Sequence, residues 1–368
     1  MKTVQRLLYK EIVQAVAFVA CGFIALFAFF DLVEELQNLT RMAAAGFRLQ
    51  HAFMQVGLKA PGHIYEIMPI AVLIGSIFVM ARLAQSSEFT ILRTGGLAPL
   101  RALRILLQLG LGFVLLTFLL GDYIAPWSER QSTLLKSQFR GEITTGRTGA
   151  WLKERTETSH SAVNVKAFND QAHMVGVRIH EFNPQGQLLS ITQAAKGEFG
   201  EGVWKLQGVN REEIQSSDKQ QTLKIAIRKL PALDWPTGIT ADMVAAALLS
   251  PDQMKIWDLF LYTNHLSKNN QNAQQYDIQL WRKVFYPLSC LVMLTLALPF
   301  AYLHFRSGQI AGHVFGGVMA GISFYLLNNV FGHIGNLQNW VPWITSAAPS
   351  LLYTLISLAA FAWMVNKQ

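Results

Sequence analysis

The residues best placed for chemistry lie in one short segment of the chain. It carries a carboxylate, an aromatic ring, an aliphatic side chain and a guanidinium within two helical turns: Glu88, Phe89, Leu92 and Arg93. Ser86-Ser87 can cap a helix that starts here, and Gly95-Gly96 can end it. An exposed aromatic ring beside an acid is a good docking anchor. The segment is therefore either a plain connecting helix at the lipid surface or a coupling helix that docks on a cytoplasmic motor subunit.

The sequence patterns of catalysis are missing. The chain has no GxxxxGKS/T phosphate-binding loop, no HExxH, no Cys/His cluster and no GxSxG around a serine. Its formal net charge is +8, but the basic residues do not gather into the single stripe that nucleic-acid binding requires. We expect a non-catalytic protein with no cofactor, no metal site and no nucleic-acid partner.

Apolar runs account for much of the chain, which is 51% hydrophobic and only 15% charged. Six of them lie at residues 12–30, 67–81, 105–121, 284–303, 310–332 and 341–365. Each approaches the roughly 20 residues that cross a hydrocarbon layer as a helix. The pattern predicts six transmembrane helices, three on each side of a long polar segment.

Basic residues sort by loop, and this predicts the orientation. Three segments on one side are basic: the N-terminus, the loop between spans two and three, and the loop between spans four and five. Their basic residues are Lys2, Arg6 and Lys10, then Arg82, Arg93, Arg101 and Arg104, then Arg306. The loops on the other side carry fewer basic residues. Because positive loops stay inside, we expect both termini in the cytoplasm and the large polar segment on the far side.

The polar segment alternates apolar and polar residues, which is the period of β-strands with one buried face. The apolar residues of this pattern are Val175, Val177, Ile179, Trp204, Leu206, Leu223 and Ile225. We expect an inserted all-β, jellyroll-like domain at 139–268, between helical halves at 1–138 and 269–368. Its apolar face is either its own closed core or a trough for lipid acyl chains.

Ionisable residues gather near the predicted far-side membrane boundary. They include Asp31, Glu66, Asp122, Arg130, Lys136, Arg282 and Lys283. Each one alone is best interpreted as an interfacial residue whose charge reaches water. As a group they could line the mouth of a cavity that accepts a charged amphiphile.

Five short motifs, together with the layout of three spans, a β-domain and three more spans, resemble a known family. The motifs are LAQSSE at 83–88, RTGG at 93–96, Ala125-Pro126, LWRKVFYPLS at 280–289 and Phe331-Gly332. Over essentially its full length the chain resembles the LptF/LptG permeases of the lipopolysaccharide exporter, and Phe331-Gly332 favours the G branch.

The resemblance implies partners and roles for individual residues. An LptF-like permease would complete the membrane part, two LptB ATPases would dock on the coupling helices, and an LptC-like single-span β-jellyroll protein would receive the lipid. Glu88 would contact the ATPase, and Lys136 would face the lipid phosphates. Span one lacks the outer lysine frequent in that family, so phosphate contact would fall to Arg41, Arg130, Lys136 or Arg282, or to divalent cations held by Asp31 and Glu34.

On this interpretation the protein lies in the inner membrane of a Gram-negative bacterium. It would extract lipopolysaccharide from the outer leaflet and pass it to a periplasmic β-jellyroll bridge, powered by a separate ATPase. Exposing one acyl chain of about a dozen methylenes to water costs on the order of 10 kcal/mol, so such a lipid needs a machine. An ATPase-driven mechanotransmission subunit that moves the β-domain without carrying lipid is the alternative. The missing catalytic motifs disfavour a membrane-embedded hydrolase.

Overall fold

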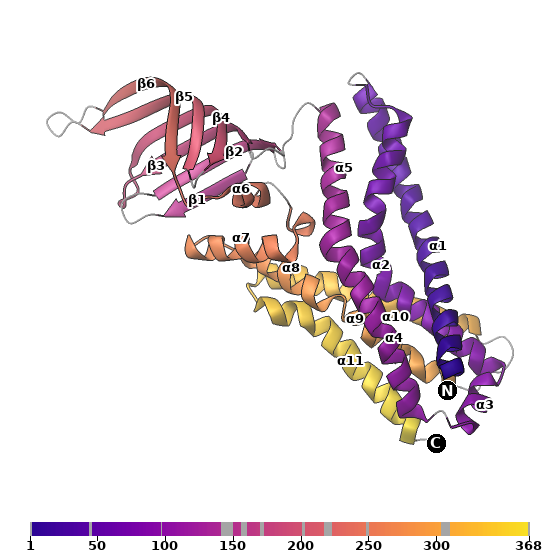
Figure 1. Cartoon of the computed structure of the whole chain (residues 1–368). Helices are drawn as coiled ribbons and strands as arrows, with labels where there is room; N and C mark the ends of the chain where they lie inside the picture. Colours follow the sequence, from indigo (N-terminus) through magenta and orange to yellow (C-terminus); the bar gives the residue numbers. More distant parts are fainter. Residues whose placement is uncertain are drawn as a thin grey trace. The chain divides into compact units, whose positions relative to one another are not determined.

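The computed structural model describes residues 2–43, 46–96, 98–140, 150–155, 160–169, 173–200, 203–216, 223–247, 250–302 and 310–366. The chain divides into two compact units. One consists of Met1–Ser132 with Asp277–Gln368, and it is helical. The other is Thr133–Tyr276, and it contains all the described strands (Figure 1).

The helical unit is built from long apolar helices and the shorter helices that connect or continue them. They are α1 (Lys2–Met42), α2 (Leu49–Gln85), α3 (Glu88–Thr94), α4 (Pro99–Leu119), η2 (Leu120–Ile124), α8 (Gln274–Phe285), α9 (Ser289–Ala297), η4 (Leu298–Tyr302), α10 (Ile310–Leu337) and α11 (Pro342–Asn366). The π-helix η2 joins α4 to α5 (Ala125–Arg140), so that one continuous span runs from Pro99 to Lys136.

Five of these helices are long and apolar enough to cross a membrane, and a bent pair raises the number to six. The pair is α8 with α9 and η4, and it bends by 46° at the break between Phe285 and Ser289. Pro287 lies in this break, and proline removes a helical hydrogen bond there. The predicted class, membrane helices with an inserted β-domain, is confirmed.

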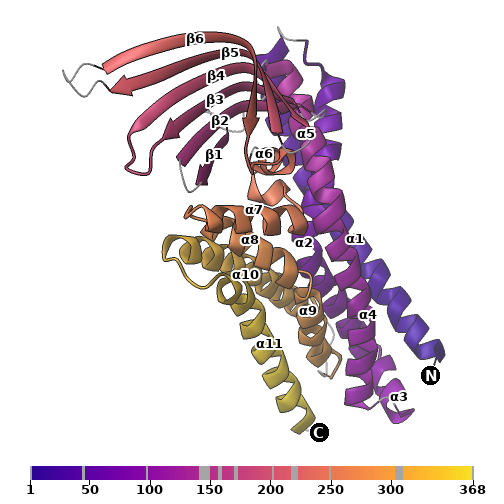
Figure 2. The same ribbon diagram turned by 60° about the vertical axis from the view of Figure 1, so that its left-hand side comes forward.

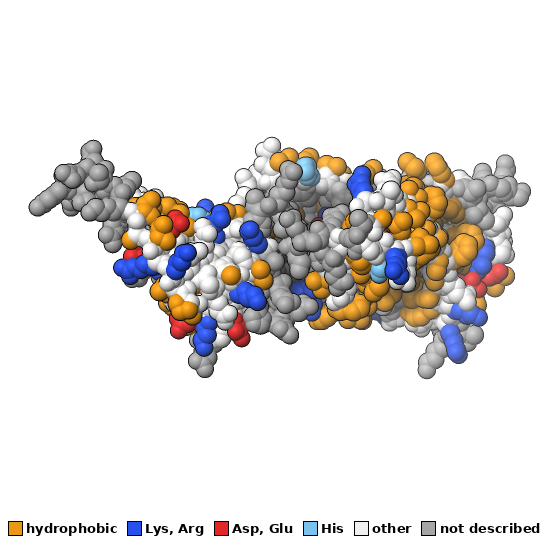
Figure 3. All heavy atoms as spheres, turned by 90° about the horizontal axis from the view of Figure 1, so that it is seen from above, with side chains coloured by type: hydrophobic (Ala, Val, Ile, Leu, Met, Phe, Trp, Pro, Cys, Tyr) orange, Lys and Arg blue, Asp and Glu red, His pale blue; other side chains and the backbone are white. Residues whose placement is uncertain are grey.

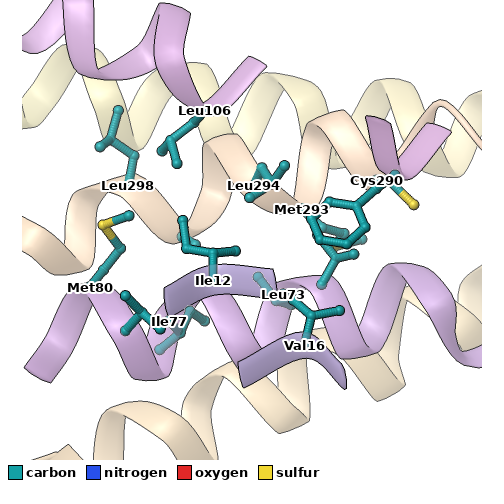
Figure 4. Packing of buried hydrophobic residues seen from close by; sticks show 14 of the residues in the cluster. Ile12, Val16, Leu73, Ile77, Met80, Leu106, Cys290, Met293, Leu294 and Leu298 are labelled. Atoms are coloured by element: carbon teal, nitrogen blue, oxygen red, sulfur yellow. The ribbon is translucent and has the colours of Figure 1, made fainter. Parts of the chain in front are cut away.

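Helix α2 lies at the centre of the helical unit because it is apolar on all sides. Its 66–83 stretch is almost entirely buried, whereas most of α1 is exposed. Side chains from α1, α2, α4, α9 and η4 interdigitate around it (Figure 4). The labelled members of this core are Ile12, Val16, Leu73, Ile77, Met80, Leu106, Cys290, Met293, Leu294 and Leu298.

Two glycines permit close helix contacts in this core. A Cβ on Gly75 would lie 2.7 Å from the backbone nitrogen of Val16, and one on Gly110 would lie 2.6 Å from a methyl carbon of Leu291. Both distances are shorter than van der Waals contact, so these helices approach closely only because the side chains are absent.

The second unit contains six antiparallel strands that pair strictly in sequence order: β1 (Ala150–Arg155), β2 (His160–Asn169), β3 (His173–Phe182), β4 (Leu188–Gly200), β5 (Val203–Ser216) and β6 (Leu223–Pro236). They form one curved sheet (Figure 2). A tight turn at Asn183–Gln187, with Gly186 at φ +83°, joins β3 to β4. The order is that of a meander.

A crease crosses this sheet at Gly176 and Gly208. Both glycines have positive φ, +66° and +65°. In a regular strand, every second side chain points to the same face. Met174 and Val177 are both buried although they lie three residues apart, so the alternation of buried and exposed side chains shifts by one residue at Gly176. Glycine adopts this left-handed conformation without strain.

The concave base of the sheet is closed by the segment after β6. Trp204 is fully buried, and its indole Nε1 donates a 2.7 Å hydrogen bond to the carbonyl of Ile239. Helix α6 (Ala241–Ala247) packs on β1 and β2, and after η3 (Pro251–Gln253) helix α7 (Ile256–Lys268) packs on α6.

The surfaces of the two units differ in composition. Acidic and basic side chains intermix on the surface of the sheet, whereas hydrophobic side chains are broadly exposed on the helical unit (Figure 3).

Candidate functional site

Helix α3 is the exposed connection between α2 and α4. Figures 1 and 2 both show it at the end of the helical unit where the two chain termini lie. Ser87 occupies its N-cap position with φ +60° and makes no side-chain cap, and the Ser86 hydroxyl donates back to the carbonyl of Arg82 at 3.1 Å. The predicted serine cap is therefore wrong: these serines end α2, and Gly96, at φ +100°, ends the connection.

Phe89 does not extend into solvent, so its predicted exposure is also wrong. It is only 3% exposed, and its ring packs edge-on against Tyr302 with 4.9 Å between centroids. Leu92 is partly buried beside it, and the Arg93 guanidinium lies 5.7 Å from the centre of the same tyrosine ring. Phe89 and Leu92 attach α3 to the core because their three-residue spacing gives them one helix face.

The other described side chains of α3 are exposed. Glu88 and Arg93 are exposed, as the sequence predicts. Between them Ile91 is 68% exposed, which sequence reasoning missed. The signal was present in the helical spacing: if Phe89 and Leu92 face inward, Ile91 must face outward. The exposed surface of α3 therefore combines an acid, an aliphatic side chain and a guanidinium.

The four basic residues assigned to lipid phosphate lie in different environments. Arg41 and Arg130 are exposed, and Lys136 is partly buried. Arg282 already contacts two asparagines of α10. Its Nη2 donates to Oδ1 of Asn329 at 2.6 Å. In the flipped orientation of the Asn328 amide, the Asn328 oxygen accepts from Nε of Arg282 at 3.2 Å. The structure thus leaves Arg41 and Arg130 accessible and holds Arg282 against α10.

An acidic cluster joins α1 to α2 and centres on Lys59, which sequence reasoning missed. Its Nζ lies 3.1 Å from Asp31, 3.3 Å from Glu34 and 3.5 Å from Glu35. Nε2 of His63 lies 2.7 Å from the other Asp31 oxygen. The ammonium group thus takes the place that a divalent cation would occupy between Asp31 and Glu34. Lys59 and His63 stand four residues apart on one face of α2, which was the available signal.

A buried lysine joins spans three and four at the π-helix. Lys283 is 4% exposed, and its Nζ donates a 3.0 Å hydrogen bond to the carbonyl of Gly121 in η2. The ring of Tyr65 packs where a Gly121 side chain would be, and it also contacts Tyr286 at 5.2 Å between centroids. The Tyr286 hydroxyl donates to the carbonyl of Glu66. One layer therefore connects α2, η2 and α8.

The residues assigned to an acyl trough do not share one surface. Val177, Ile179, Trp204 and Leu206 are 0–2% exposed and belong to a filled core. Val175 and Ile225 are 43% and 62% exposed. Val175 precedes the crease, and Ile225 alternates with Ala226, so both lie on the other face of the sheet. The backbone of Leu223 pairs with Ser216, and its side chain lies outside the described residues.

Toward the turn between β3 and β4 the core face becomes polar. Glu181 accepts hydrogen bonds from Ser190 at 2.6 Å and from Arg211 at 3.0 Å. Arg211 also pairs with Glu213 at 3.2 Å, and Arg228 lies 3.7 Å from that acid. Arg211 and Arg228 lie in the same cross-strand row as Ile179, and Glu181, Ser190 and Glu213 lie in the next row of that face, so an ion-paired network replaces apolar side chains at this end of the sheet.

Comparison with known proteins gives a single result. The family model described as lipopolysaccharide export system permease LptF/LptG matches residues 6–363. The lipopolysaccharide export system permease protein LptG of Escherichia coli K12 is 26% identical over 341 residues, which cover 92% of this chain and 91% of that protein. The protein of the same name from Haemophilus influenzae is 26% identical over 371 residues, covering 100% and 99%.

Proposed function

Because this chain belongs to the LptF/LptG family of lipopolysaccharide export permeases, we propose that it is one membrane half of an exporter driven by a separate cytoplasmic ATPase. It extracts lipopolysaccharide from the outer leaflet of a Gram-negative inner membrane and hands it to a periplasmic β-jellyroll bridge. The match over nearly the whole chain is the observation that carries the proposal. An LptF-like permease, two LptB ATPases and an LptC-like protein complete the complex.

The order of the spans supports placing α3 and the β-domain on opposite sides of the membrane. Helix α3 lies between spans two and three, and the β-domain lies between spans three and four, so one membrane crossing separates them. Basic residues in the N-terminal segment and the α3 connection favour the cytoplasm for both termini and for α3. The β-domain then lies in the periplasm.

Coupling runs through the two faces of α3. Glu88, Ile91 and Arg93 face the ATPase, and Phe89 packs on Tyr302 at the end of the bent fourth span. A movement of the docked ATPase therefore acts on η4 and α9 through an aromatic contact instead of through a flexible loop. Span four contacts span three through Lys283, so the movement can reach the outer part of the membrane.

Lipid capture is proposed for the exposed basic residues. Arg41 and Arg130 are exposed and can bind phosphate by charge-assisted hydrogen bonds, and Lys136 joins them from the helix that leaves span three. Arg282 contributes only if it leaves Asn328 and Asn329. Transfer through the β-domain requires its core face to open, because four of the proposed trough residues are buried in it.

That closed core favours one second candidate function. A subunit that moves its β-domain to transmit force, without passing lipid through it, needs a filled interior like that around Trp204 and Leu206. The two functions differ in a measurable way. Photo-crosslinking groups placed at Ile179 or Leu206 would capture lipopolysaccharide during ATP turnover if lipid passes, and would capture none if the domain only transmits force.

The proposal is tested with the complete complex in proteoliposomes. Glu88→Ala and Ile91→Asp should reduce both ATPase retention and lipopolysaccharide release several-fold, because each removes part of the exposed face of α3. Arg104→Gln is the matched control, since Arg104 is an exposed charge on the neighbouring helix α4. Full ATPase binding and transport in both α3 variants would refute the coupling role.

A further inference from the structure

Helix α7 has a buried face and an exposed face, and the exposed one begins with large apolar rings. Its buried residues are Leu259, Tyr262, Thr263, His265 and Leu266. On the opposite side Trp257 is 66% exposed and Phe260 is 53% exposed. The same side continues with Asn264, Ser267 and Lys268, all exposed, and Leu261 is partly buried beside Phe260.

The two exposed rings form one surface. They stand three residues apart, on one side of the helix, and their planes stack with 6.0 Å between centroids. Trp257 carries an indole N–H on a large apolar body, which is the chemistry enriched where lipid headgroups meet hydrocarbon. Lys255 precedes the rings and Lys268 ends the helix, so cations flank the apolar surface.

The chain also limits how far α7 can lie from the membrane. Only residues 269–273 separate Lys268 from α8, the first part of the bent fourth span. Five extended residues and their flanking bonds reach about 20 Å at most. The link is shorter than that, because the Gln271 N–H donates back to the carbonyl of Leu266 at 2.9 Å. A helix tethered so closely to a span lies within reach of lipid headgroups.

We propose that α7 is a membrane-surface helix, with Trp257 and Phe260 inserted between the headgroups of the leaflet on the side of the β-domain. Asn264 and Ser267 lie on the same side of the helix, at the level of the lipid headgroups, and Lys255 and Lys268 lie at the level of the lipid phosphates. The occupant of the exposed face is bulk phospholipid. The buried face of α7 belongs to the core of the β-domain unit, so the base of that domain is anchored to the bilayer.

Spin labels measure this directly in the assembled complex, reconstituted in vesicles of phosphatidylethanolamine and phosphatidylglycerol without lipopolysaccharide. One label at a time replaces Trp257, Phe260, Asn264 or Ser267, after Cys21 and Cys290 are changed to serine. We expect collisions with oxygen to exceed collisions with a water-soluble nickel chelate at positions 257 and 260, and the two collision rates to be comparable at the polar headgroup positions 264 and 267. Nickel access at all four positions, or low access to both reagents at 257 and 260, would overturn the proposal in favour of water or a protein partner.

A second measurement needs no change to the cysteines. Fluorescence of the unmodified complex minus that of a Trp257→Phe complex gives the signal of Trp257 alone. Lipids brominated near the headgroup should quench this difference at least twofold more than lipids brominated near the acyl end. An unquenched difference signal would refute insertion, whether or not the complex transports lipopolysaccharide.

Discussion

Shortening Phe89 to alanine should disconnect α3 from span four while leaving the ATPase-facing side chains in place. The ring is 3% exposed and contacts Tyr302, so the change removes a buried aromatic side chain and leaves a cavity. Such changes cost about 3–5 kcal/mol in a well-packed core. Since about 1.4 kcal/mol is a factor of ten, the lower value reduces the attached state of α3 about a hundredfold relative to the detached one.

The assay is the amount of lipopolysaccharide released per ATP hydrolysed by the complex in proteoliposomes. We expect Phe89→Ala to lower this ratio at least tenfold, whereas Phe89→Leu, which keeps most of the buried area, lowers it about threefold or less. Combining Phe89→Ala with Tyr302→Ala should show a coupling of about 0.5–1.5 kcal/mol in thermal unfolding, as for other aromatic pairs.

The control is Tyr302→Phe. Among the described residues its buried hydroxyl has no hydrogen-bond partner, so removing it should leave coupling and stability unchanged or slightly improved. A Phe89→Ala complex that folds, binds ATPase and exports lipopolysaccharide with the normal yield per ATP would refute the reasoning.

Three further outcomes follow from the described contacts. Lys59→Met should destabilise the protein by about 3 kcal/mol in thermal unfolding, because it leaves fully buried Glu35 without its ammonium partner, whereas Lys59→Arg should be tolerated. Lys283→Met should cost about 2 kcal/mol by the same measurement, since the Gly121 carbonyl loses a charge-assisted bond, and an unchanged unfolding temperature would contradict this role. Burial lowers the pKa of His265 below its ordinary 6.5, so the folded domain binds fewer protons than the unfolded chain in mild acid. Domain stability should therefore fall as the pH drops below about 6.5 and level off below the lowered pKa, and His265→Gln should flatten the profile.

The six spans and the β-domain could be predicted because their signals are long and redundant. A run of twenty apolar residues has few alternatives, and period-two alternation recurs in several strands. The face of the sheet on which each side chain lies was harder to predict. Alternation alone places Val175 and Val177 on one face, but Gly176 adopts φ +66° and moves them to opposite faces. A glycine inside a strand marks such a shift without giving its direction.

The candidate site was predicted in its location but not in its orientation. The short helix α3 could be predicted from its flanking serines and glycines. Whether Phe89 points to solvent or to the core depends on Tyr302, which is over two hundred positions away in the sequence. Lys59 was missed for a similar reason: its three acidic neighbours lie on another helix. Contacts of this kind leave no trace in local periodicity.

Burying the ammonium group of Lys283 against a main-chain oxygen has a mechanical consequence. If span four slid along span three, this buried cation would leave the Gly121 carbonyl, and separating a buried charge from its partner costs several kcal/mol even in a relaxed protein. The two neighbouring spans are therefore expected to move as a pair, and the π-helix at Leu120–Ile124 is a point in span three at which the helix can bend.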